Sequence, residues 1–164
     1  MPIVETLTRL AEPWASAYGD SKLLMNGVMF GHVGGFLVAG GLAIAADRAV
    51  IRATNAGADA RRVHLSEFHA VHAPVLVGLA VTFATGLLLF LADVETFATA
   101  PVFWIEMGSL ALLLANGAGL RRAAHRLDTG EAPDRDWQAL RRSAAASTLL
   151  CLVAVLTGVM LVNL

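Results

Sequence analysis

Four long stretches almost free of charge dominate the hydrophobic pattern of this chain. Residues 23–46, 68–92 and 143–164 contain no Asp, Glu, Lys or Arg, and residues 96–120 are interrupted only by Glu106. A helix needs about 20 apolar residues to cross the ~30 Å hydrocarbon layer of a membrane. Each stretch reaches this length. The pattern therefore predicts an all-α fold, an integral membrane four-helix bundle in contact with the lipid bilayer.

The residues that flank these stretches extend them into one membrane domain over residues 1–164. We expect spanning helices at 22–54, 66–92, 97–127 and 134–164. Ser66 is the expected N-cap of the second helix, with Glu67 in its first turn. Pro74 lies inside that helix, where a proline can kink the backbone.

The first twenty residues form a separate element with its own apolar face. Its large apolar side chains recur every three or four residues, which is the period of one helix face, at Ile3, Leu7, Leu10, Trp14 and Tyr18. Trp and Tyr favour the headgroup zone of a membrane. We therefore expect an N-terminal interfacial amphipathic helix over 1–20, bent near Pro13. A partly disordered tail is the alternative interpretation.

Charge and composition further narrow the class of protein to which this chain can belong. Only 15% of the residues are charged, against about 25% in ordinary soluble domains. The net charge of −1 provides no basic surface for a nucleic acid partner. The single cysteine, Cys151, lies among Leu and Val in the last stretch, where we expect a packed thiol.

The basic residues predict the orientation in the membrane. The connection after the second stretch carries Asp93 and Glu95 and no Lys or Arg. Ten of the twelve basic residues lie in the connections after the first and third stretches, at Arg48, Arg52, Arg61, Arg62, Arg121, Arg122, Arg126, Arg135, Arg141 and Arg142. Basic connections stay on the cytoplasmic side. Both termini are therefore expected on the outer, periplasmic side.

A stripe of small residues follows the first spanning helix at four-residue spacing, at Gly27, Gly31, Gly35, Ala39 and Ala43. Because lipid provides no hydrophobic drive for helix association, small residues that allow close backbone approach take its place. The stripe is expected to face protein. Its partner is either another helix of this chain or a second protomer in a homo-oligomer or larger membrane complex. A glycine-rich groove also leaves room for a flat cofactor.

Two ionisable residues, His32 and Glu106, fall inside the predicted spans. At ~1.5 Å of rise per residue, they lie ~14 Å and ~8–15 Å below the outer edge. A hydrogen bond between them would relieve the cost of burying both groups. The pair is therefore predicted as a proton-relay or cofactor-ligand element, or else as a structural clasp between the first and third helices.

A second group of histidines lies toward the inner side. His69 and His72 are three residues apart at the start of the second helix, and His125 ends the third. Imidazoles one turn apart can bind a metal, or His72 can serve as an axial haem ligand with His125 opposite. Solvated histidines beside the arginines are the alternative. The levels of His32 and His72 differ by ~15 Å, so they do not share one haem in a simple way.

The chain resembles small four-helix bacterial membrane families related to copper-resistance D-type and di-haem cytochrome b-like proteins. The resemblance rests on GHVGG around His32, HAVHAP around His72, and the segment from Gly78 through TGLLLFLADVETFATAPVFWIEM to about Asn116. It implies a connection to haem b or copper in a bacterial inner membrane, with His32 and His72 as candidate ligands. The members of these families tend to carry Lys where this chain has Glu106, so no role is carried over to that position.

Three functions remain open at this point. The chain can be a haem b or metal-binding membrane protein in electron transfer or haem handling. It can be a non-catalytic accessory subunit or oligomeric scaffold of a larger membrane complex. It can also be a proton-coupled carrier that uses His32 and Glu106. The chain shows no nucleophile–base set, phosphate-binding loop or cysteine cluster, so the sequence does not predict a hydrolase or kinase.

Overall fold

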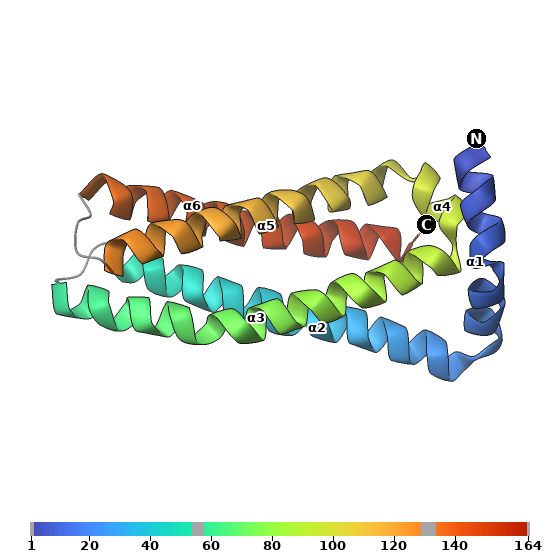
Figure 1. Cartoon of the computed structure of the whole chain (residues 1–164), viewed down its shortest axis with the longest axis horizontal. Helices are drawn as coiled ribbons and strands as arrows, with labels where there is room; N and C mark the ends of the chain where they lie inside the picture. Colours follow the sequence, from blue (N-terminus) through green and yellow to red (C-terminus); the bar gives the residue numbers. More distant parts are fainter. Residues whose placement is uncertain (1, 54–57, 129–133, 164) are drawn as a thin grey trace.

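The computed structural model describes residues 2–53, 58–128 and 134–163, and this part of the chain is all-helical (Figure 1). Two shorter helices, α1 (Pro2–Asp20) and α4 (Val94–Thr99), lie at one end of the molecule. Four long helices run along its length, namely α2 (Lys22–Ala53), α3 (Ala58–Ala92), α5 (Pro101–Asp128) and α6 (Asp134–Leu161).

All four long helices are long and apolar enough to span a membrane. The qualifying segments are Lys22–Arg52, Ala73–Ala92, Pro101–Ala123 and Trp137–Leu161. Large apolar side chains point outward from them, such as Phe30, Leu37 and Phe83. Contiguous apolar surface of this kind is rare on soluble monomers. The prediction of an all-helical fold with four helices able to span a membrane is confirmed.

The helix bounds differ from the expected ones at two places. The second spanning helix, α3, begins at Ala58, so Ser66 lies inside it rather than at its N-cap. The expected third helix is divided at Ala100, whose backbone is extended, into α4 and α5. Pro101 explains the division because proline disfavours helical geometry in the preceding residue but fits the first turn of a helix. Asp93 caps α4 by accepting a hydrogen bond from the Thr96 amide at 3.1 Å.

The long helices are arranged as a ring around the bundle axis. Helix α2 packs against α3 and α6, α5 packs against α6, and a slight contact between α3 and α5 closes the ring. In the described ranges α2 and α5 therefore lie diagonally and do not contact each other. This arrangement decides which intramembrane side chains can meet.

The α2–α3 contact is built on glycine. A Cβ atom on Gly35 would lie 2.9 Å from the Gly78 carbonyl oxygen, and one on Gly78 would lie 2.8 Å from the Gly35 carbonyl oxygen. Ala39, next to Gly78, is 1% exposed. Gly31 faces the Thr85 methyl group, whereas Gly27 has open space around it. The stripe from Gly31 to Ala39 thus packs within the chain, and Gly27 lies outside this contact.

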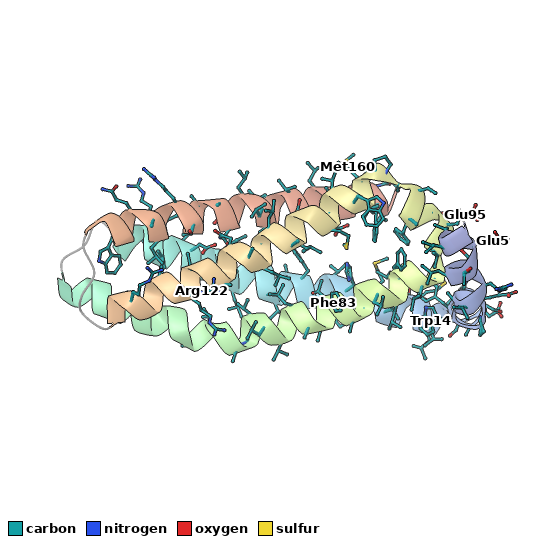
Figure 2. The ribbon with its side chains drawn as sticks, turned by 45° about the horizontal axis from the view of Figure 1, so that its top comes forward. Glu5, Trp14, Phe83, Glu95, Arg122 and Met160 are labelled. Atoms are coloured by element: carbon teal, nitrogen blue, oxygen red, sulfur yellow. The ribbon has the colours of Figure 1, made fainter. Side chains whose placement is uncertain are left out.

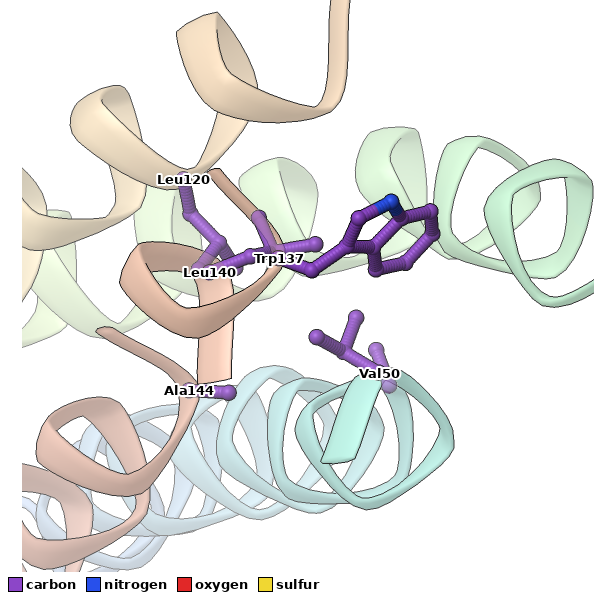
Figure 3. Packing of buried hydrophobic residues seen from close by; sticks show 6 residues of the cluster. Val50, Leu120, Trp137, Leu140 and Ala144 are labelled. Carbon is purple, nitrogen blue, oxygen red and sulfur yellow. The ribbon is translucent and has the colours of Figure 1, made fainter. Parts of the chain in front are cut away.

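Apolar side chains fill the bundle at the end away from α1. Figure 3 shows the cluster, which comprises Ala46, Val50, Leu120, Trp137, Leu140 and Ala144. The buried positions of α6 continue from it at alternating spacings of three and four, at Trp137, Leu140, Ala144, Ser147, Cys151 and Ala154. This repeat is the one that left-handed helix packing requires. Cys151 is a buried free thiol, as expected.

Helix α1 lies across the end of the bundle, roughly perpendicular to the long helices (Figures 1 and 2). The Trp14 indole donates a hydrogen bond to the Leu88 carbonyl of α3 at 2.8 Å. Trp14 and Tyr18 are half-buried, whereas Ile3 and Leu10 are 73% and 72% exposed. The expected apolar face is therefore divided between the bundle and the outside. Helix α1 continues through Pro13.

We predict that Gly35→Leu lowers the melting temperature of the detergent-purified protein, because a leucine there meets the α3 backbone. Overpacking at a tight contact costs about 1–3 kcal/mol. Gly34→Leu is the matched control, since nothing lies within 4 Å of a Cβ at Gly34. Circular dichroism melts measure both variants. Equal melting temperatures for the two would contradict the assigned contact.

Candidate functional site

His32 lies on α2, close to the glycine crossing, and its ring faces α3. Its Nδ1 is 3.0 Å from the Thr82 carbonyl oxygen. A carbonyl only accepts hydrogen bonds, so Nδ1 carries the proton in this contact. The Thr85 hydroxyl lies 3.4 Å from the same nitrogen and itself donates to the Val81 carbonyl at 2.6 Å. Thr85 Oγ1 is therefore a second acceptor for His32.

Gly86 allows the imidazole to approach α3 closely. A Cβ atom at Gly86 would lie 3.0 Å from His32 Cε1 and 3.3 Å from Nδ1. The Thr82 hydroxyl, which donates to the Gly78 carbonyl at 2.9 Å, lies 3.5 Å from the His32 carbonyl. Because the Thr82 hydroxyl has one proton and the Gly78 carbonyl is the nearer acceptor, His32 is held through its ring. With Nδ1 protonated, Nε2 keeps a lone pair.

Glu106 is a buried carboxyl on a different side of the bundle. It lies on α5, is 9% exposed, and faces α6, where its Oε1 would lie 3.6 Å from a Cβ atom on Gly158. The structure does not bring it together with His32, whose hydrogen bonds in the described residues go to α3. The prediction of a pair placed the two residues together only because they lie at a similar depth below the outer edge of the membrane. Depth does not determine which neighbour each helix face meets, and α2 and α5 are diagonal.

Asp47 forms a polar site that the sequence analysis did not single out. It lies on α2 and is 2% exposed. Its carboxyl faces the Ser147 and Thr148 hydroxyls of α6, with the buried Cys151 thiol nearby. Asp47 Oδ2 and Thr148 Oγ1 are buried and complete no hydrogen bond.

A signal for Asp47 was present in the sequence. The small-residue stripe advances by four from Gly31 to Ala43, and its next position is Asp47. The charge-free stretch ends at Ala46 because of this aspartate, so a search for uncharged stretches leaves Asp47 outside that stretch. In the structure Arg48 is exposed and Asp47 is buried.

The inner histidines can be placed by backbone only. His69 and His72 lie in α3, and His125 lies in α5. Their side chains fall outside the described part of the structure, as does that of His64. The predicted metal site at His69 and His72, and the haem ligation by His72 and His125, therefore stay predictions.

We predict that Gly86→Val displaces the His32 imidazole from the Thr82 carbonyl, because the new side chain occupies the position of the ring edge. Nitrogen-15 NMR of histidine-labelled protein should show loss of the Nδ1-protonated signal that His32→Gln also removes. Loss of one such hydrogen bond costs about 0.5–1.5 kcal/mol. Gly41→Val, at a position with nothing within 4 Å, is the control. An unchanged His32 signal in Gly86→Val would refute the contact.

Comparison of the chain with protein-family models, with curated proteins and with solved structures gave no match.

Proposed function

We propose that this chain is a multi-pass protein of the bacterial inner membrane that binds haem b through His32, in electron transfer or haem handling. The contact of His32 Nδ1 with the Thr82 carbonyl carries the proposal. It leaves Nε2 with the lone pair that a metal needs. Histidines that bind metals are commonly oriented by a carbonyl or carboxylate at their other nitrogen.

The residues around His32 suit this role. The Thr82 carbonyl holds the tautomer and the ring orientation, and Gly86 lets the ring lie close to α3. The neighbouring side chains on α2, such as Met29 and Phe36, are apolar, and an apolar shell limits access of water to a metal site. A haem bound there would supply one-electron chemistry at its iron.

The inner histidines would serve a separate site. His32 packs beside Thr85 of α3, and His72 lies thirteen residues earlier on the same helix. At the helical rise these levels are ~20 Å apart. Two residues at such different levels would not hold the same iron, so His72 is not assigned to a haem held by His32.

The positions of charged groups support an orientation in the membrane. Helices α1 and α4 and the C-terminal end lie at one end of the bundle, and Arg122 lies toward the other (Figures 1 and 2). We assign the end with the arginines to the cytoplasm and the end with α1 to the periplasm. In this orientation α1 lies on the periplasmic surface of the inner membrane, where exposed Ile3 and Leu10 can enter the lipid.

The haem proposal is tested by absorption spectroscopy. We expect purified wild-type protein to show a Soret band and a pyridine haemochromogen spectrum of haem b. His32→Ala should remove the haem, and Gly86→Val should lower haem affinity by about 10–100-fold, as for loss of an orienting contact. His72→Ala is the matched control and should keep the haem. Wild-type protein that stays haem-free after reconstitution, or haem loss in His72→Ala alone, would reject the assignment to His32.

The orientation is tested by reporter fusions. A phosphatase domain, which is active only after export, should be active when fused after Asp93 and inactive when fused after Gly130. A cytoplasmic fluorescent reporter should give the reverse pattern. Phosphatase activity at Gly130 would invert the assigned orientation.

A further inference from the structure

Asp47 is a carboxyl group inside a membrane-spanning helix with no ionic partner in the described residues. It is one of the largest fully buried side chains, together with Leu140 and Cys151. Its span ends at Arg52, five residues away, so Asp47 lies ~8 Å inside that end. An unpaired ionised carboxylate in such a place is costly. Protonation of the carboxyl would avoid this cost.

The groups around Asp47 supply hydroxyls rather than positive charge. On α6 the carboxyl faces Ser147 and Thr148, with the buried Cys151 nearby. On its own helix the adjacent Arg48 is exposed. On α3 the residue packed beside this region is the apolar Val71. His69 and His72 also lie on α3, and their side chains are outside the described part.

Two buried side-chain oxygens at this site, one on α2 and one on α6, lack a hydrogen-bond partner. Asp47 Oδ2 and Thr148 Oγ1 are both buried, and neither completes a hydrogen bond. A carboxylate oxygen can only accept, whereas a protonated carboxyl can donate, and a hydroxyl oxygen can accept. The Thr148 hydroxyl can also donate to an ionised Oδ2, which satisfies both atoms but leaves the charge buried. A proton on Oδ2, donated to Thr148 Oγ1, would satisfy both atoms as well. It would also remove the buried charge.

We propose that Asp47 is a proton-binding site, held as a neutral carboxylic acid between α2 and α6 with its O–H donated to Thr148. Loss of this proton leaves a buried carboxylate that attracts water or a cation, which separates α2 from α6. The site is independent of the proposed haem ligand, because it lies fifteen residues from His32 on α2 and contacts a different helix. Proton occupancy of Asp47 thereby controls the α2–α6 contact.

Infrared spectroscopy of the full-length protein in liposomes tests the proposal. A carbonyl band of a protonated acid should be present at about pH 5, where an ordinary aspartate is ionised, and should shift on carbon-13 labelling of aspartate. Asp47→Asn should abolish the band. Glu106→Gln, which changes the other buried carboxyl, should leave the aspartate band in place.

A second variant keeps the test valid if Asp47→Asn does not fold. Thr148→Val preserves shape but removes the acceptor, so the acid band should move to higher frequency. Absence of an aspartate acid band in the wild type would overturn the proposal. Sodium-dependent melting of the wild type, absent from Thr148→Val, would also overturn it and assign a cation site instead.

Discussion

The backbone contact between Gly35 and Gly78 sets the rotation of α2, and the positions of the polar groups follow from it. Because two carbonyl oxygens lie where side chains would be, one face of α2 must point at α3. His32 is close to this face and reaches Thr82. Asp47 lies twelve residues beyond Gly35, which is about three and one third turns. It therefore points away from α3 and toward α6.

The intramembrane polar residues divide into two kinds. Some hydroxyl side chains form hydrogen bonds within their own helix, as Ser109 does to the Ile105 carbonyl and Thr157 to the Val153 carbonyl. This back-bonding costs little and carries no functional implication. Imidazole and carboxyl groups cannot be satisfied in this way inside a helix. His32, Glu106 and Asp47 therefore depend on neighbouring helices, which makes them the residues on which function is expected to rest.

The two ends of the bundle are chemically different. At one end α1 crosses the helices and is fastened by Trp14 to the last turns of α3, next to the capped α4. At the other end the exposed arginines surround an apolar cluster built around Trp137 and Leu140. The Asp47 site lies near the arginine end. Glu106 lies near the α1 end, five residues into α5. The described part of the molecule thus has one buried carboxyl toward each end of the bundle.

The sequence by itself determined the number of spanning helices, because length and apolarity alone decide whether a helix can cross lipid. It also identified the small-residue stripe and the burial of Cys151. Only the tertiary structure decided which helices are neighbours, and this separated His32 from Glu106 and joined Asp47 to α6. Periodicity describes one helix at a time, so it does not encode the rotation of one helix against another. The division of the third span at Ala100 is a local effect of Pro101, so the sequence contained it although the expected helix over 97–127 ran through it.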